Sequence, residues 1–268
     1  MVLRSVREQL QAAGAALQLM TRLPVPVQIP FKPLILARSV VYYPLVGAII
    51  GLIAAGAGWL LSLAVPPLPA VVIVLIVWTG LSGALHLDGL MDTADGVLSH
   101  RPRERMLEIM KDSRVGAMGV MAAVFLLLLK FAVLATLFER QNWPSLMPVI
   151  AAACAWSRLW IVCSMAWWPF ARPKEGLASM FAGVRARHAG MALAMQALVV
   201  IVLGLAFGQL WSDLWLWALV QAAVTLLSGM VLSRWLNRKL GGLTGDTYGA
   251  MNEIIETLLL FAALWHVR

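Results

Sequence analysis

The chain has 268 residues, of which 61% are hydrophobic and 13% are charged, and its formal net charge is +8. An ordinary soluble domain carries about 25% charged residues, so a soluble fold of this length could not bury so much apolar surface. The basic residues are scattered between apolar stretches, which argues against nucleic-acid binding. The composition predicts an all-α, polytopic integral membrane protein.

The N-terminal segment carries no signal-peptide pattern, because Met1–Leu10 is polar and the short apolar stretch after it contains Gln18. Arg4–Met20 instead predicts an amphipathic helix on the membrane surface. We expect one membrane domain over residues 1–268, with an interfacial segment at 1–40 and a transmembrane bundle at 41–267.

Windows of about 20 apolar residues predict about seven transmembrane helices. They cover Val41–Leu63, Leu68–Leu87, Gly116–Phe138, Pro148–Trp168, Gly190–Leu210, Leu214–Ser233 and Ala250–Val267. The second is expected to continue past the bilayer boundary and to carry an aspartate-rich motif into water. The last carries Glu253 and Glu256 in its first turns, so its apolar signal is the poorest of the seven.

The basic residues orient these helices. Five precede the first span, five follow the second, four follow the fourth and three follow the sixth, so 17 of the 21 Lys and Arg residues lie on one side. By the positive-inside rule this side is cytoplasmic. The polar motifs described below all fall on it, as expected for an enzyme that uses a cytosolic substrate.

The motif His86-Leu-Asp-Gly-Leu-Met-Asp-Thr-Ala-Asp-Gly96 ends a long apolar run. In a helix, Asp88, Asp92 and Asp95 lie within roughly 60° on one face, at about 100° per residue. Acids gathered beside a bilayer indicate a site, and clustered carboxylates suit Mg²⁺. A solvated helix end that pairs with nearby arginines is the alternative. His86 lies on another face, so we interpret it as a packed or interfacial histidine and not as a ligand.

The next polar stretch begins at Pro102, a typical first-turn proline. Acids at spacing four predict an interfacial cytoplasmic helix, either as part of a site or as a solvated face: Glu104, Glu108 and Asp112. Lys111 and Arg114 precede Gly116 and a membrane helix, where free N–H groups and cations suit a diphosphate. A positive-inside stop signal would give the same pattern.

Thr244-Gly-Asp246 precedes the last predicted helix, which carries Glu253 and Glu256. We expect Asp246 and these glutamates to form a second acidic wall of the site. Lys130 and Arg158 lie within predicted spans, either as buried partners of an acid or as substrate contacts. The two cysteines share one apolar segment and are interpreted as packed hydrophobic residues: Cys154 and Cys163.

The motifs together resemble those of the cobalamin synthase family, also called adenosylcobinamide-GDP ribazoletransferases. The resemblance runs from about residue 18 to 258 and rests on five segments in this order: Thr21–Pro26, Tyr43–Gly47, His86–Gly96, Glu108–Gly116 and Gly241–Asp246. The strings Asp88–Gly96 and Glu108–Gly116 are long and specific, and neither departs from the family pattern.

The resemblance implies a Mg²⁺-dependent enzyme of the bacterial inner membrane. It would join adenosylcobinamide-GDP to α-ribazole, or its 5′-phosphate, in the last step of adenosylcobalamin synthesis, and release GMP. Three aspartates would hold the metal and, with a fourth, carry the catalysis: Asp88, Asp92, Asp95 and Asp246. Substrate would be bound by Lys111, Asp112, Arg114, Gly116, Arg22 and Glu253. Contacts with membrane lipid, other cobalamin-assembly enzymes and further copies of the chain are compatible with this role.

Two other functions stay open at this stage. A CDP-alcohol phosphotransferase also uses membrane aspartates, but Asp92-Thr93 stands where its pattern needs Ala-Arg. A cation-coupled transporter would place its acids near the midplane of the membrane. The position of the aspartates separates this transporter from an enzyme.

Overall fold

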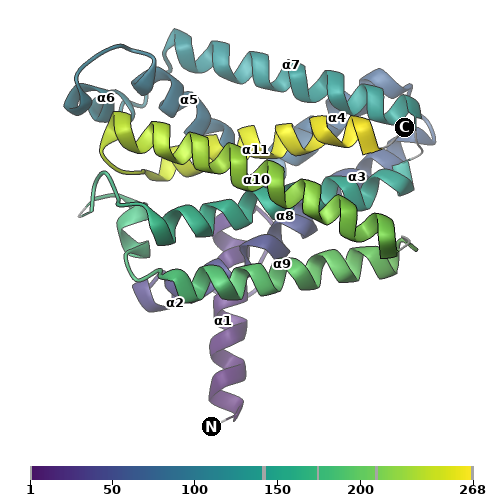
Figure 1. Ribbon diagram of the computed structural model, residues 1–268, viewed down its shortest axis with the longest axis horizontal. Helices are drawn as coiled ribbons and strands as arrows, with labels where there is room; N and C mark the ends of the chain where they lie inside the picture. The colour runs from purple at the N-terminus through teal and green to yellow at the C-terminus, as the bar shows by residue number, and fades with distance from the viewer. Residues whose placement is uncertain (1, 141–142, 174, 209–210, 267–268) are drawn as a thin grey trace.

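The computed structural model describes residues 2–140, 143–173, 175–208 and 211–266, and within them the chain is helical with one isolated β-bridge. The predicted all-α class is therefore confirmed. The helices, drawn in Figure 1, are α1 (Val2–Met20), α2 (Pro33–Ser39), η1 (Val40–Tyr42), α3 (Tyr43–Ser62), α4 (Pro67–Leu81), α5 (Leu85–Val97), α6 (Arg103–Ile109), α7 (Ala117–Arg140), α8 (Trp143–Trp167), η2 (Leu177–Phe181), α9 (Ala186–Ala206), α10 (Trp211–Leu240) and α11 (Gly245–His266).

Five stretches of the described chain are long and apolar enough to cross a membrane: Pro33–Ser62, Ala117–Arg140, Leu146–Trp167, Ala186–Ala206 and Trp215–Leu240. A sixth crossing results if α4 and α5 count as one broken span. The predicted number of seven is not confirmed. Helix α11 falls outside the set because Asn252, Glu253 and Glu256 lower its hydropathy.

The predicted span Leu68–Leu87 is not one continuous helix. Helix α4 ends at Leu81, and α5 leaves at an angle of 87°. Gly83 and Ala84 both have positive φ, 61° and 58°, and two left-handed residues in succession break a helix. The bend separates the aspartate motif from the preceding apolar helix.

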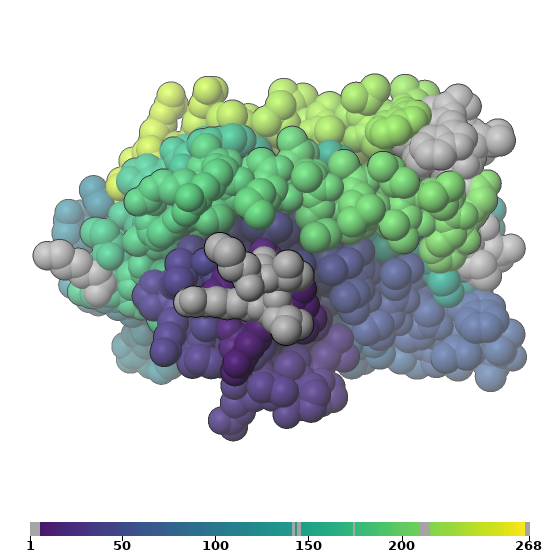
Figure 2. Space-filling model, turned by 90° about the horizontal axis from the view of Figure 1, so that it is seen from below, coloured from purple at the N-terminus to yellow at the C-terminus, as the bar shows by residue number. Residues whose placement is uncertain are grey.

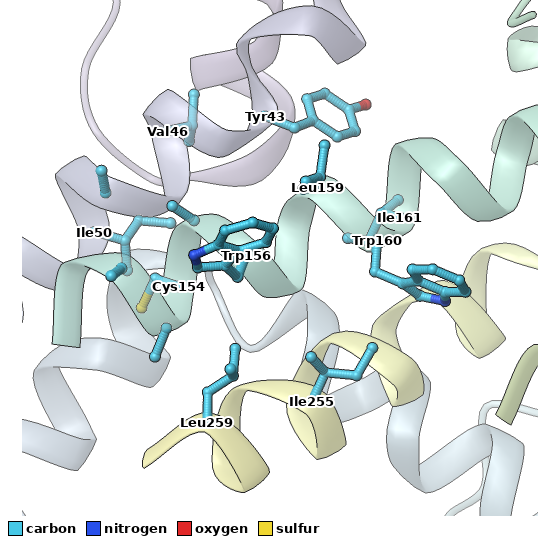
Figure 3. Packing of buried hydrophobic residues seen from close by; sticks show 14 of the residues in the cluster. Tyr43, Val46, Ile50, Cys154, Trp156, Leu159, Trp160, Ile161, Ile255 and Leu259 are labelled. Atoms are coloured by element: carbon cyan, nitrogen blue, oxygen red, sulfur yellow. The ribbon is translucent and has the colours of Figure 1, made fainter. Parts of the chain in front are cut away.

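Helix α8 forms the centre of the bundle. In its apolar stretch within Leu146–Trp167, 94% of the residues are buried, and the helix packs against α3, α9, α10 and α11. Figure 3 shows Tyr43, Val46 and Ile50 of α3 on one side of α8. A Cβ on Gly51 would lie 2.6 Å from the Cα of Ala151, so small residues allow the two backbones to approach closely.

The predicted N-terminal helix is present as α1, and it runs across the long axes of the bundle helices (Figure 1). Its small residues Ala12, Ala15 and Ala16 are buried, whereas Leu10 is exposed. In Figure 2 the purple N-terminal segment lies beside green α9, and η1 contacts that helix. Such an orientation is typical of a helix that lies in the plane of a membrane surface.

Candidate active site

Three connections meet at one end of the bundle, which we call the loop end. The Leu243 N–H donates to the Pro169 carbonyl (2.8 Å), and the Ala171 N–H donates to the Leu243 carbonyl (2.9 Å). Arg172 Nη2 donates to the Leu107 carbonyl at 2.6 Å. The segment around α6, the connection after α8 and the turn before α11 therefore form one surface.

The turn before α11 needs glycine where it meets the connection after α8. Gly242 has φ 157°, and a Cβ there would lie 2.6 Å from the Phe170 carbonyl carbon. Thr244 and Thr247 then begin the helix, because each hydroxyl accepts the other residue's backbone N–H, at 2.8 and 3.2 Å. This reciprocal cap fixes the first turn of α11, in which Asp246 lies.

Helices α5 and α11 cross closely enough to bring their aspartates together. A Cβ on Gly89 would lie 2.7 Å from the carbonyl oxygen of Asp246. We call Asp88, Asp92 and Asp246 the acidic cluster. Asp92 is repelled by the charges of Asp88 and Asp246, and also by that of Asp95, and it is attracted by Arg172.

The acidic cluster has no ion-pair partner. Among the residues that the structure describes, no Lys, Arg or His lies within ion-pair distance of any of its three carboxylates. Carboxylates that repel one another without a paired cation favour an added one.

The cluster fits one mode of Mg²⁺ binding and not another. In the described part of the chain, no three His, Cys, Asp or Glu side chains are placed to hold a metal ion by themselves. Mg²⁺ is usually held by one or two carboxylates, with waters and substrate phosphates completing its shell. The oxygen donors present suit that second mode.

Asp95 has a different environment from the cluster. Its Oδ2 accepts the Gly116 N–H and its Oδ1 accepts the Gly119 N–H, both at 2.8 Å. These bonds satisfy donors at the start of α7, which no carbonyl within the helix can reach. The geometry therefore gives Asp95 and Gly116 a clear task in orienting α7, and their predicted roles in metal and substrate binding stay predictions.

The predicted phosphate-binding cations are paired in the structure. Lys111 forms an ion pair with Glu175, which lowers the pKa of Glu175. Arg114 donates to both carboxylate oxygens of Asp112, at 2.6 to 3.2 Å. These bonds hold the pKa of Asp112 at about 2. Both pairs lie at the exposed loop end, where a phosphate could displace the acidic partner.

Arg172 is a site residue that the sequence analysis did not single out. Its Nε is buried and has no hydrogen-bond partner among the described residues. It lines two hollows, one shared with Asp88 and Asp246 of the acidic cluster and another of about 400 Å³ beside Glu108 and Lys111. The only signal in the sequence was its position in a polar segment on the predicted cytoplasmic side.

The hollow at the acidic cluster is a cavity of about 240 Å³ that reaches from the loop end into the bundle. Asp88, Asp246 and Arg172 line its polar part. Its other walls are largely apolar and include Met20, Tyr43, Ile161, Met165 and Phe181. A ligand held there has charged groups at one end and apolar surface at the other.

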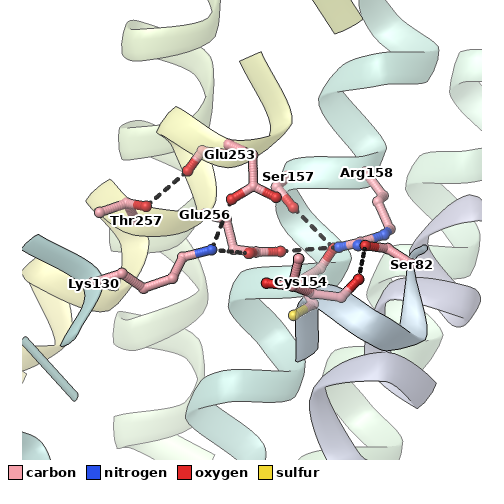
Figure 4. A network of polar contacts seen from close by, with 9 residues as sticks. Ser82, Lys130, Cys154, Ser157, Arg158, Glu253, Glu256 and Thr257 are labelled. Atoms are coloured by element: carbon pink, nitrogen blue, oxygen red, sulfur yellow. Dashed lines mark hydrogen bonds and ion pairs between the residues drawn. The ribbon is translucent and has the colours of Figure 1, made fainter. Parts of the chain in front are cut away.

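Glu253 and Glu256 lie inside the bundle and do not form one wall with Asp246. Lys130 Nζ lies 2.9 Å from Glu253 and 2.7 Å from Glu256, and Arg158 Nη1 lies 3.0 Å from Glu256 (Figure 4). We call these four residues the buried network. Seven residues of helix separate Glu253 from Asp246, or about 10 Å along the axis. Lys130 and Arg158 are therefore buried partners of acids, which is one of the two predicted alternatives; the other was contact with the substrate.

The remaining predicted residues lie outside the polar part of the cavity. The backbone N–H of Arg22 donates to the Leu81 carbonyl at 2.7 Å, and the Arg22 guanidinium packs against Gly83 at the bend before α5. His86 is buried, 3% exposed, and lines the cavity away from its charged groups. The two cysteines are free and buried, as predicted: Cys154 and Cys163.

Comparison with known proteins adds a family to this geometry. A family model described as cobalamin-5-phosphate synthase matches residues 12–264. The chain is similar to an adenosylcobinamide-GDP ribazoletransferase of Desulforamulus reducens, with 42% identity over 85% of this chain and 86% of the relative. Proteins of the same name from Klebsiella pneumoniae and Brevibacillus brevis are 41% and 36% identical. These two matches cover 93% and 91% of this chain, and 98% and 94% of the relatives. No solved structure matches the chain.

Proposed function

Because the chain belongs to the cobalamin-5-phosphate synthase family, we propose that it catalyses the reaction for which its relatives are named, that of an adenosylcobinamide-GDP ribazoletransferase. The reaction is the last assembly step of adenosylcobalamin. Its substrates are adenosylcobinamide-GDP and α-ribazole or its 5′-phosphate, and GMP is released.

The chemistry is a substitution at one phosphorus atom. A hydroxyl oxygen of ribazole forms a bond to the phosphorus that is joined to cobinamide. The bond between this phosphorus and the oxygen that bridges the two phosphates breaks, and GMP leaves with that oxygen. The hydroxyl proton passes to a carboxylate. Catalysis of this type depends mainly on positioning and on neutralising phosphate charge.

The residues of the cavity supply these functions. Arg172 has a free, buried Nε that can donate to a phosphate oxygen. Asp246 lines the cavity, and among the described residues only its Oδ2 accepts a hydrogen bond, from Thr244, which leaves its other carboxylate oxygen available. Both oxygens of Asp95 already accept backbone N–H groups. Asp246 is therefore favoured over Asp95 as the carboxylate that takes the hydroxyl proton.

Mg²⁺ is the metal that best fits the acidic cluster. Asp88 and Asp92 would hold it together with the diphosphate, and when bound it would neutralise charge on the phosphates. Lys111 and Arg114 lie at the same loop end, on the side where the leaving GMP would emerge.

The site faces the cytoplasm in this proposal, and the protein is a multi-pass protein of the inner membrane. Support comes from the sequence, in which 17 of the 21 Lys and Arg residues fall on one side of the predicted spans, as the positive-inside rule requires. The aspartates lie at the end of the bundle and not at its middle, which suits an enzyme better than a transporter.

The observation that carries the proposal is the unpaired acidic cluster beside Arg172 in a cavity at the loop end. The test is GMP release by purified, detergent-solubilised protein given adenosylcobinamide-GDP and α-ribazole, with Mg²⁺ or EDTA. We expect Mg²⁺-dependent GMP and a cobalamin product, and a fall of about 100-fold or more in kcat for Asp246→Asn.

Glu139→Gln is the matched control, because Glu139 is an exposed acid at the other end of α7. It should retain the activity of the unmodified protein. Absence of GMP from a folded preparation that binds both substrates would overturn the proposed reaction. Full activity of Asp246→Asn would overturn the role of Asp246 alone.

A further inference from the structure

The cavity beside the acidic cluster continues past its charged part into the bundle, and the proposed reaction does not use this inner part. The inner walls come from α1, α3, α5, α8, η2 and α11. Three aromatic side chains of these walls take part in edge-to-face pairs. Tyr43 pairs with Phe181 at a centroid distance of 6.5 Å, and Tyr248 pairs with Phe170 at 6.4 Å. Rigid aromatic walls suit a planar ligand.

Three buried polar side chains of this cavity have no hydrogen-bond partner among the described residues: Tyr43, His86 and Tyr248. Tyr43 is fully buried, and His86 and Tyr248 are each 3% exposed. The unpartnered atoms are the two tyrosine hydroxyls and both ring nitrogens of His86. Buried polar groups in native proteins are almost always paired, so a group that lines a cavity unpaired indicates a ligand or water as its partner.

The size of the cavity restricts what can enter. Its volume is about 240 Å³, below the roughly 300–1,000 Å³ of pockets for drug-sized ligands. A corrin macrocycle does not fit, whereas the base of a nucleoside does. Guanine carries several polar groups around its edge, but these inner walls offer few polar partners. The benzimidazole base of α-ribazole, by contrast, presents mostly carbon atoms and one free ring nitrogen.

We propose that the inner cavity binds the heteroaromatic base of the acceptor nucleoside, with the Tyr248 hydroxyl and the His86 imidazole facing its ring nitrogen. The assignment rests on the proposed function. It places the sugar between the inner walls and the polar part of the cavity, and the attacking hydroxyl beside Asp246. The base thereby determines where the nucleophile lies.

Titration calorimetry on the full-length, detergent-solubilised protein tests this assignment. It measures the binding of α-ribazole and, separately, of adenosylcobinamide-GDP. Tyr248→Phe removes only the hydroxyl and should weaken α-ribazole binding about tenfold, the effect of one buried hydrogen bond. Ala178→Phe fills the cavity from η2 and should abolish α-ribazole binding. Both variants should leave the Kd of adenosylcobinamide-GDP unchanged.

Ala182→Phe is the matched control, because Ala182 is exposed at the end of η2 and does not line the cavity. It should bind both substrates normally. Unchanged α-ribazole binding in Ala178→Phe and Tyr248→Phe, with GMP release intact, would overturn the base site and leave the proposed function standing. Loss of adenosylcobinamide-GDP binding in place of α-ribazole binding would reassign the cavity to that substrate. An unmodified protein that binds neither substrate would overturn both proposals.

Discussion

Helix α11 carries acidic residues in two regions, and the regions differ in whether their carboxylates have ion-pair partners. Near the middle of α11, Glu253 and Glu256 face Lys130 and Arg158 in the buried network, which has no net formal charge. In the first turn, Asp246 joins an acidic cluster that has no ion-pair partner among the described residues. Buried charges that are fully paired serve the fold, whereas unpaired charges that open to a cavity remain available to a ligand.

The largest expected effect comes from breaking the buried network. Glu256→Gln removes the carboxylate that faces both Lys130 and Arg158, and it leaves positive charge uncompensated inside the bundle. Loss of one partner of a buried pair costs about 3–5 kcal/mol. Thermal unfolding in detergent should show a large drop in Tm for this variant and none for Glu139→Gln. An unchanged Tm for Glu256→Gln would mean that the network does not stabilise the fold.

The next effect concerns the cation beside the acidic cluster. Arg172→Gln removes the charge that faces the cavity, and we expect kcat/KM for adenosylcobinamide-GDP to fall about 100-fold, or about 2.7 kcal/mol. The Tm should change little, because the residue lies at the loop end. Arg172→Lys should recover part of the activity, since a lysine keeps the charge but not the planar geometry. A variant that loses stability but keeps its kcat/KM would contradict the role in binding.

A smaller effect is expected at Asp95, which belongs neither to the buried network nor to the acidic cluster. Asp95→Asn keeps one acceptor oxygen but places an amide group against a backbone N–H at the start of α7. The loss of a charge-assisted hydrogen bond costs about 1–2 kcal/mol. We expect a modest fall in Tm, and GMP release should fall only as far as α7 shifts. A loss of activity with no change in Tm would instead support the predicted role of Asp95 in metal binding.

The sequence predicted the features that depend on local pattern. The apolar windows located five spanning stretches, and the helical spacing of Asp88 and Asp92 placed them on one face of α5. The apolar windows missed the bend before α5. Ser82-Gly83 is a turn signal that the apolar run obscured, and the left-handed conformation of Ala84 depends on packing.

Features that depend on the approach of distant segments could not be predicted. Glu253 and Asp246 look alike in the sequence, and only the neighbouring helices supply Lys130 to one and not to the other. Arg172 became a site residue because Gly242 allows two connections to meet at a close distance. Neither contact has a periodicity or a motif of its own.

We propose that the acidic cluster, together with the diphosphate of the substrate, holds the metal ion. The most direct measurement is binding of Mn²⁺, as a probe for Mg²⁺, by electron paramagnetic resonance on the purified protein. No three side chains are placed to hold an ion alone, so we predict tight binding only when adenosylcobinamide-GDP is present. Asp92→Asn should abolish this binding, and Glu139→Gln should retain it. Substrate-dependent Mn²⁺ binding that persists unchanged in Asp92→Asn would contradict the claim.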